Sequence, residues 1–284
     1  MTEGTRPFSD EQIAQHLANV QDEAMEGKDL IGPSEDLEAL LVEYTQGSEV
    51  YQYKIKALKE KYPRFCRSRG DGNCFFRAFG YAWFEDLLTS KDAQLLPRTI
   101  EHLEGTKHLL KAAGFEMVAL EDFYDLTLDL LRALPTHTRP SLLRNFNDPE
   151  TSNAIVCYLR FLTAAHVRTH PDDFAPFIEE ANGDVARYCE RSIEAFGQES
   201  EEIAVIALVR ALHVPVHVVY LDGRGEDPAS NQANTHSFFP EEGKDSSTIH
   251  PPISLLYRPG HYDLLYSKES VASYSQEKEE EEKE

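Results

Sequence analysis

The chain has 284 residues, of which 41% are apolar, and its formal net charge is −22 at pH 7. The length suits one compact enzyme domain with extensions, and the apolar share is enough to build a sizeable core. The acidic balance argues against nucleic acids and anionic membrane surfaces as partners, because both require a basic face on the protein.

The two ends of the chain are polar. The first six residues lack the apolar segment of a signal peptide, and no apolar run approaches the roughly 18 residues that span a bilayer. The last eight residues contain six Glu and two Lys, which is typical of a disordered, solvated tail. We therefore expect a soluble, monomeric protein of the cytoplasm, with the nucleus also open to it and a disordered acidic tail over 268–284.

Four cysteines are present, and their spacing bears on both redox state and metals. They are too few and too scattered for a disulfide framework, and no Cys/His cluster has zinc spacing. We therefore expect no metal and no cofactor. Cys66, Cys157 and Cys189 are interpreted as structural thiols, with the last two buried in helical cores.

An N-terminal helix is indicated by a capping box, in which Ser9 is followed by Gln12. Ile13, Leu17 and Val20 then recur at helical spacing and form a narrow apolar stripe. A loop containing several Gly and Pro residues follows at 27–34. Two interpretations stay open: the helix docks on its own domain, or it is an arm whose stripe binds a partner. This segment, 1–33, is taken as the first of three units, and 34–267 as the catalytic domain.

Helices dominate the middle of the chain. Ser34 is expected to cap a helix that carries Leu37, Leu40 and Tyr44, and a further helix runs over 50–62 until Pro63 ends it. Residues 64–70 form a linker to a glycine turn. Further helical periods cover 75–88, 100–113, 120–134, 152–167, 173–181, 184–192 and 201–212.

Strands gather at the C-terminal end. A β-branched run predicts a strand over 214–220, and a short one is expected near 237–239 in a long polar loop. Residues 253–257 and 261–266 form a hairpin around Pro259 and Gly260. The predicted fold class is α+β: a small twisted sheet flanked by helical layers.

Cys74 is the candidate nucleophile. It follows a turn in which Gly70 and Gly72 flank Asp71, and it opens an apolar helix. The free N–H groups and the dipole at a helix start favour a thiolate. The same N–H groups, from Cys74 and from Asp71, Gly72 and Asn73, are expected to bind the oxyanion that forms when the thiolate attacks a carbonyl.

His261 and Asp263 are the candidate base and its orienting group. Residues two apart on a strand share a face, so both side chains point the same way. Asp263 is expected to accept the Nδ1–H of His261, leaving Nε2 for the Cys74 thiol. Gly260 is expected to leave the approach open. Asp71 belongs to the catalytic set as a brace for the turn, since Asp263 is better placed as the third member.

Two separated motifs resemble one family. Residues 71–78 (DGNCFFRA) look like the cysteine motif of the ovarian-tumour (OTU) cysteine deubiquitinases, and residues 257–263 (YRPGHYD) look like its histidine motif. Residues 51–56, 146–148 and 158–163 are similar to the otubain branch in particular, and the similarity runs over about 10–267. Phe76 is the one departure in the cysteine motif, where many relatives have Tyr.

The resemblance implies a papain-like OTU fold and a ubiquitin thioesterase or isopeptidase. It would cleave the bond between the C-terminal glycine of ubiquitin and a lysine, with preference for the chain type that targets proteins to the proteasome. It also implies ubiquitin and polyubiquitin as partners, ubiquitin-conjugating (E2) enzymes as further ones, and an N-terminal arm that holds the proximal ubiquitin. By analogy, 177–202 and 222–247 would bind the distal ubiquitin.

Two other functions stay open alongside the isopeptidase. One is a binding protein that inhibits E2 enzymes without catalysis, and the other is a peptide-bond protease unrelated to ubiquitin. The presence of Cys74, His261 and Asp263 together favours catalysis, because a pure binding protein has no need of all three.

Overall fold

The computed structural model of the chain describes residues 27–45, 49–178, 183–222, 232–240 and 251–272. The predicted N-terminal helix, with Ile13, Leu17 and Val20, lies outside these ranges, as do 277–284 and much of the long polar loop. No helix within the described ranges is long and apolar enough to cross a membrane.

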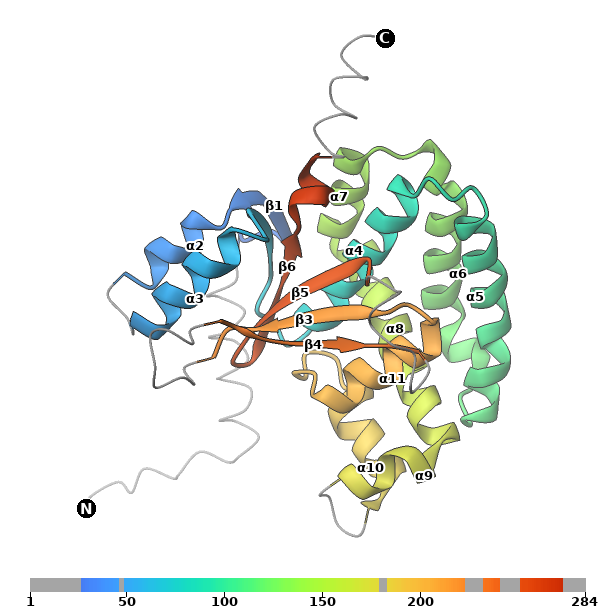
Figure 1. The fold of residues 1–284 in the computed structure, drawn as a ribbon. Helices are drawn as coiled ribbons and strands as arrows, with labels where there is room; N and C mark the ends of the chain where they lie inside the picture. Colours follow the sequence, from blue (N-terminus) through green and yellow to red (C-terminus); the bar gives the residue numbers. More distant parts are fainter. Residues whose placement is uncertain (1–26, 46–48, 179–182, 223–231, 241–250, 273–284) are drawn as a thin grey trace, which may run out of the picture.

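A mixed six-stranded sheet forms the centre of the molecule (Figure 1). Its strand order is β1-β2-β6-β5-β3-β4, and all neighbours are antiparallel except β3 and β5. The strands are β1 (Ile31–Asp36), β2 (Arg64–Ser68), β3 (Val216–Tyr220), β4 (Asn234–Phe238), β5 (Ile253–Arg258) and β6 (His261–Tyr266). The predicted hairpin is confirmed: Arg258 pairs with His261 across a two-residue turn in which Gly260 has φ 75°.

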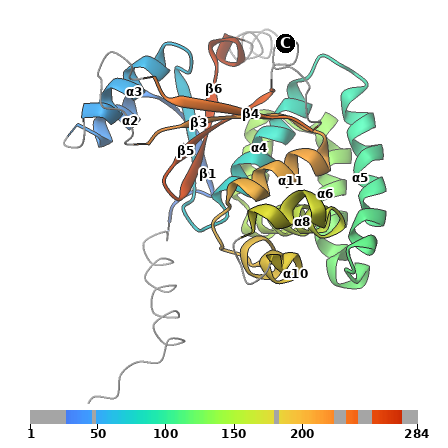
Figure 2. The same cartoon turned by 60° about the horizontal axis from the view of Figure 1, so that its bottom comes forward.

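Helices cover both faces of this sheet, so the α+β prediction is confirmed. The small layer on one face contains α2 (Glu38–Glu43) and α3 (Glu49–Lys59), and it packs on Phe65, Val219 and Leu256 of the sheet. The large layer on the other face contains α4 (Cys74–Thr89), α5 (Leu95–Ala112), α6 (Met117–Ala133), α7 (Arg139–Asn147), α8 (Pro149–Thr169) and α11 (Glu202–Leu212). Figure 2 shows the two helical layers on either side of the strands.

Short helical pieces connect α8 to α11. They are α9 (Pro171–Phe174), a 3-10 turn (Ala175–Phe177), α10 (Val185–Tyr188) and a π-helical segment (Cys189–Glu194). The predicted continuous helix over 173–181 was wrong, because α9 ends after one turn and the 3-10 turn contains Pro176. The predicted helix over 184–192 is present, but its second half widens into the π segment.

Two strands near the N-terminus correct the sequence prediction. Ser34 lies inside β1 and caps no helix, and the expected linker from residue 64 is β2, a strand between β1 and β6. Leu30 and Ile31 are buried, and their N–H groups donate to Asn147 Oδ1 at 2.7 and 3.0 Å. The catalytic domain therefore begins before residue 34.

Two further differences lie at α7 and at the C-terminal end. Sequence periodicity gave no helix over 139–147, where Thr138 and Ser141 form a capping box and Pro140 stands in the first turn. Residues 268–272 are helical, so the predicted disordered tail does not begin at 268.

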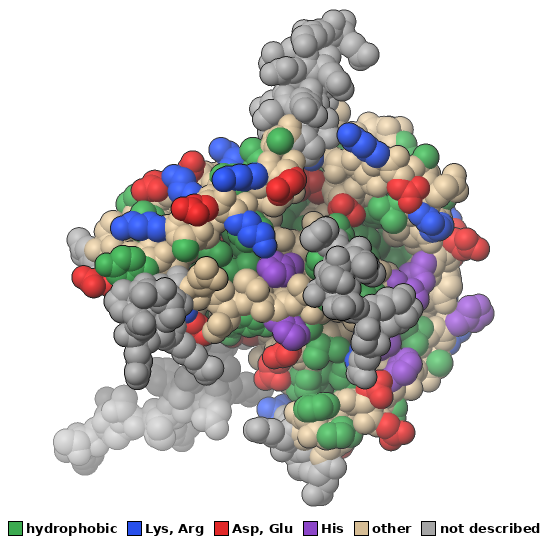
Figure 3. Space-filling model, viewed as in Figure 1, with side chains coloured by type: hydrophobic (Ala, Val, Ile, Leu, Met, Phe, Trp, Pro, Cys, Tyr) green, Lys and Arg blue, Asp and Glu red, His purple; other side chains and the backbone are tan. Residues whose placement is uncertain are grey.

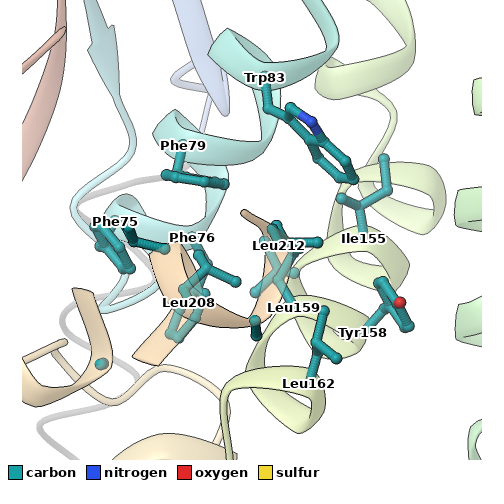
Figure 4. Close-up of a cluster of buried hydrophobic side chains, with 14 of the residues drawn as sticks. Phe75, Phe76, Phe79, Trp83, Ile155, Tyr158, Leu159, Leu162, Leu208 and Leu212 are labelled. Atoms are coloured by element: carbon teal, nitrogen blue, oxygen red, sulfur yellow. The ribbon is translucent and has the colours of Figure 1, made fainter. Parts of the chain in front are cut away.

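The main core lies between the sheet and α4, α8 and α11. Figure 4 shows Phe75, Phe76 and Phe79 of α4 meeting Leu208 and Leu212 of α11. Side chains of α8, among them Ile155, Tyr158 and Leu159, close the same cluster. Because the first turn of α4 is embedded in this cluster, the helix start that carries Cys74 is held rigidly.

Candidate active site

A glycine turn positions Cys74. Gly72 has φ 74°, a conformation that residues with a Cβ rarely adopt. A Cβ at Gly72 would also lie 1.8 Å from the carbonyl oxygen of Gly197. Only glycine therefore lets the turn lie directly against the segment that precedes α11. The chain then enters α4 at Cys74, as predicted, with the thiol at the helix N-terminus.

β6 brings the base to this thiol. The rings of Phe75 on α4 and Tyr262 on β6 pack with centroids 5.2 Å apart. Tyr262 points to the opposite face of β6 from its two neighbours in sequence, as strand geometry requires. The His261 ring forms a hydrogen bond with Asp263, and the Cys74 thiol lies close enough to the same ring to raise its pKa. The three residues predicted from separate motifs are thus brought together.

The orientation of the imidazole differs from the prediction. Nε2 of His261, not Nδ1, pairs with Asp263 Oδ1, at 2.7 Å. Nδ1 is therefore the ring nitrogen that faces Cys74. The i, i+2 spacing fixes which face of the strand the two side chains share, but it does not fix the rotation of the ring, and the position of Cys74 relative to β6 decides that rotation.

Asp263 is fully buried, and three donors hold it. They are the His261 ring, the backbone N–H of Ser68 at 3.0 Å, and the guanidinium of Arg258. Burial alone would raise the pKa of this carboxyl, but the hydrogen bond from His261 and the charge of Arg258 outweigh burial and lower the pKa. Asp263 is therefore a fixed negative charge behind the imidazole.

This arrangement keeps His261 protonated. Burial opposes the charged ring, yet the hydrogen bonds to Asp263 and Cys74 and the charges of both groups raise the pKa of His261 to about 9. At neutral pH the ring is an imidazolium with an N–H directed to each neighbour. An imidazolium beside a thiol favours the thiolate, which is the reactive form.

We expect the contribution of His261 to stability to depend on pH. Because its pKa in the folded chain lies above the ordinary 6.5, that contribution is complete below pH 6.5 and is lost as pH rises through about 9. The difference in unfolding free energy between the wild type and His261→Gln should therefore shrink over this range. Urea unfolding followed by Trp83 fluorescence, at about pH 6 and about pH 9.5, measures it. A difference that grows with pH would contradict the assignment.

Asp71 braces the turn, as predicted. Both of its carboxylate oxygens accept from Arg77 Nη1 at 2.8 Å, and Oδ1 also accepts the backbone N–H of Asn73 at 3.0 Å. This second bond corrects the prediction for Asn73, whose N–H is occupied and is not available to an oxyanion. The remaining candidate donors are the N–H groups of Cys74 and of Asp71 and Gly72.

The region around Gly260 is less open than predicted. A Cβ at this position would lie 2.9 Å from Oε1 of Glu199, so the Glu199 carboxylate lies directly over the hairpin turn. Gly260 is therefore required by its positive φ and by this close approach.

Four polar residues around the site were missed from the sequence: Ser68, Arg77, Arg160 and Arg258. Arg77 and Arg160 are fully buried on α4 and α8, and Arg258 lies beside Asp263. The available signal was an arginine within each of the motif segments 71–78, 158–163 and 257–263. A buried arginine needs several acceptors, and these are supplied by segments far apart in sequence.

The other cysteines and the surface agree in part with expectation. All four cysteines are free, Cys66 and Cys189 are buried, and Cys157 is partly exposed, not buried as predicted.

Within the described ranges, no group of three His, Cys, Asp or Glu side chains is arranged to hold a metal ion. On the face in Figure 3, basic side chains over α2 and α3 are interspersed with acidic ones.

A family model, described as Peptidase C65 Otubain, matches residues 23–267. The chain belongs to the otubain family of peptidases. It is 39% identical over 249 residues to the "OVARIAN TUMOR DOMAIN-containing deubiquitinating enzyme 1" of Arabidopsis thaliana, which covers 84% of this chain and 81% of the relative. It is 37% identical to "Ubiquitin thioesterase OTUB1" of Homo sapiens, with 90% of each chain covered.

Solved structures agree with this otubain assignment. A complex described as "h/ceOTUB1-ubiquitin aldehyde-UBC13~Ub" superposes with a TM-score of 0.81 at 30% identity, covering 91% of this chain and 98% of its own. A second complex, with UBCH5B~Ub in place of UBC13~Ub, gives the same values. The papain-like OTU fold expected from the motifs is therefore confirmed.

Proposed function

We propose that the chain is a ubiquitin thioesterase and isopeptidase in which Cys74 is the nucleophile. The observation that carries this proposal is the arrangement at the start of α4, where Cys74 lies beside the His261 ring and Asp263 Oδ1 binds the far side of that ring at 2.7 Å. Otubain relatives named as ubiquitin thioesterases support ubiquitin as the substrate.

The reaction follows from the charges at the site. The Cys74 thiolate attacks the carbonyl carbon of the C-terminal glycine of ubiquitin, and the N–H groups of the turn stabilise the oxyanion. His261 gives its Nδ1 proton to the leaving lysine amine, so the C–N bond breaks and a thioester remains. His261 then takes a proton from water, and the water oxygen attacks the thioester carbonyl. The C–S bond breaks, ubiquitin leaves with a free carboxyl group, and the Cys74 thiolate beside the His261 imidazolium is restored.

We expect a ubiquitin that carries a C-terminal electrophile to label the protein at a single cysteine. The activated Cys74 should react, whereas burial raises the pKa of Cys66 and Cys189 to about 12 and leaves these thiols unreactive. Intact mass and peptide mapping give the number and position of the adducts. Cys157→Ala is the matched control, because Cys157 is the one cysteine of the four that is not buried. Labelling that persists in Cys74→Ala would rule out the assignment.

We further propose a preference for the polyubiquitin linkage that targets proteins to the proteasome. Membership of the otubain family supports this preference. The isopeptidase proposal does not depend on it. Cleavage of a panel of di-ubiquitins, with Cys74→Ser as the inactive control, tests it. Equal cleavage of all linkages would contradict the preference and leave the isopeptidase proposal intact.

A second function, binding of E2 enzymes, is favoured by the two complexes in which OTUB1 is combined with ubiquitin-charged UBC13 or UBCH5B. We propose that the N-terminal segment with Ile13, Leu17 and Val20 contributes to this binding and to the proximal ubiquitin site. The stripe itself lies outside the described residues. The alternative, that the segment docks on its own domain, is an outcome of the next experiment.

Deletion of residues 1–26 should separate these roles. The deletion stops before Leu30 and Ile31, which are buried and must stay in place. We expect weaker cleavage of di-ubiquitin and weaker E2 inhibition, with hydrolysis of a small C-terminal ubiquitin ester retained. The three activities are measured on the same preparation, and the triple substitution of Ile13, Leu17 and Val20 by Ser serves as a full-length comparison. If ester hydrolysis is lost as well, the segment belongs to the catalytic domain.

A further inference from the structure

Arg160 is a buried cation whose hydrogen bonds all go to neutral oxygens. Its side chain is fully buried in the middle of α8. Nε and Nη2 donate to Asn73 Oδ1 at 3.1 and 2.9 Å, and Nη2 also donates to Gly72 O at 2.9 Å. On the other side, Nη1 donates to Ile193 O at 2.8 Å and Nη2 to Gln198 O at 2.7 Å. Arg160 thus ties two separate segments to α8.

The two segments also contact each other. Asn73 Oδ1 accepts the N–H of Gly197 at 2.9 Å in addition to the two bonds from Arg160. Gly72 and Gly197 both have positive φ, and a side chain on Gly72 would collide with Gly197. The turn before Cys74 and the segment 193–198 therefore form one unit, and the guanidinium of Arg160 lies at its centre.

Arg77, the other buried arginine at this turn, differs in its charge balance. Its Nη1 contacts both oxygens of Asp71 at 2.8 Å, so its charge is neutralised in place. Among the described residues, no carboxylate is paired with Arg160. Burial lowers the pKa of Arg160 to about 10, which still leaves it charged at neutral pH. A buried arginine without a carboxylate partner lowers the stability of the fold. Such perturbed charged groups cluster at functional sites.

The geometry places this charge at the turn before Cys74, because two of its bonding partners, Gly72 and Asn73, directly precede Cys74 in the chain. The guanidinium of Arg160 lies 4.6 Å from the ring centroid of Phe76, two residues after Cys74 on α4. The negative groups that favour the charged form of Arg160 are, in decreasing order of effect, Cys157, Asp71 and Cys74. In a buried site, a fixed cation stabilises both a thiolate and an oxyanion more strongly than it would in water.

We propose that Arg160 is a positioning residue for the reaction at Cys74, one that fixes the turn 71–73 against the segment 193–198 and supplies an unpaired buried positive charge to the site. This inference rests on the proposed function, because it assigns Arg160 a role in the same reaction. It assigns two separable contributions, the charge and the set of five hydrogen bonds.

Two substitutions separate these contributions. Arg160→Met removes both, and Arg160→Lys keeps the charge but cannot make the five bonds. The matched control is Arg168→Met: Arg168 also lies on α8 and binds the neighbouring segment through Glu194 at 2.6 Å, but it makes no bond to the turn. Three quantities are measured for each full-length variant: melting temperature, kcat and KM for a C-terminal ubiquitin ester, and the pH midpoint of Cys74 alkylation by iodoacetamide, read by mass spectrometry.

We expect Arg160→Met to lower kcat by about 10²-fold, because the turn 71–73 that positions Cys74 shifts. The accompanying rise in KM should be smaller than this fall in kcat. The alkylation midpoint should rise, because the thiolate loses a neighbouring positive charge. Arg160→Lys should bring the midpoint back to the wild-type value while kcat stays about tenfold low. Arg168→Met should lower the melting temperature and leave both other quantities unchanged.

Unchanged kcat and midpoint in folded Arg160→Met would overturn the proposal, as would a midpoint in Arg160→Lys as high as in Arg160→Met. If Arg160→Met does not fold, Arg160→Lys decides: the proposal fails if its kcat is that of the wild type. The alkylation measurement requires no ubiquitin. It therefore tests Arg160 even if ubiquitin proves not to be the substrate, and the two proposals can fail separately.

Discussion

Replacement of Cys74 by alanine is expected to reduce kcat for hydrolysis of a ubiquitin ester by at least about 10⁴-fold. The thiolate forms the acyl bond, and no other described group at the turn can replace it, since the Asp71 carboxylate is bound by Arg77. Ubiquitin binding should stay within about threefold of the wild type, because Cys74 is only 2% exposed and contributes little contact surface.

Steady-state kinetics and a binding titration on the same variant measure the two effects. Cys157→Ala is the matched control, with an expected kcat equal to that of the wild type. Loss of binding in parallel with kcat in Cys74→Ala would mean that the substitution disturbs the turn, and circular dichroism and melting temperature would then show it. Residual activity above about 1% would show that another nucleophile operates.

The candidate catalytic residues could be named from the sequence because their signals are local. The glycines before Cys74 indicate a turn, because glycine is the residue that readily adopts a positive φ. The spacing of His261 and Asp263 places both side chains on one face of a strand. Each signal covers a few residues, so no knowledge of the fold is needed to see it. That the two motifs lie close together was predicted only from the family resemblance. Residues 74 and 261 are far apart in the chain, and only the complete fold brings them together.

The properties that were missed depend on contacts between distant segments. The ring rotation of His261 is set by where α4 meets β6, and the bonds of Arg160 join α8 to the turn and to residues 193–198. β1 and β2 were missed for a related reason. Their sequences, IGPSED and RFCRS, lack a run of β-branched residues, and their strand conformation comes from pairing with each other and with β6.

Substitution of Asp263 by alanine is expected to lower kcat by about 10²–10⁴-fold and to affect ubiquitin binding far less. The fully buried carboxylate holds Nε2 of His261 at 2.7 Å and accounts for much of the high pKa of that ring. Without it the imidazole is free to rotate, and its pKa falls. Less imidazolium is then present to pair with the Cys74 thiolate and to protonate the leaving amine.

A control must allow for the cation that this change leaves behind. Arg258 would lose its closer carboxylate partner and keep only the longer contact with Glu43 at 3.6 Å, and a largely buried charge that loses such a partner destabilises a fold wherever it lies. Asp222→Ala makes a matched defect, because Asp222 pairs with the buried Lys54 at 2.7 Å on the α3 side of the sheet. Both variants should lose stability, and only Asp263→Ala should lose kcat by orders of magnitude. Equal losses of kcat and ubiquitin affinity in Asp263→Ala would show that Asp263 is structural.

Asp263→Asn divides the role of the carboxylate further. Asn keeps an oxygen that can accept from Ser68 N and from His261 Nε2, so the ring stays oriented, but the negative charge is lost. If orientation is the larger part, kcat should fall only about tenfold, which corresponds to roughly one pKa unit at His261. If charge is the larger part, Asn and Ala should be equally poor. We expect the first result, because the oxygen that accepts from both Ser68 N and His261 Nε2 is retained, and only the Oδ2 position that faces Arg258 becomes an NH2 group.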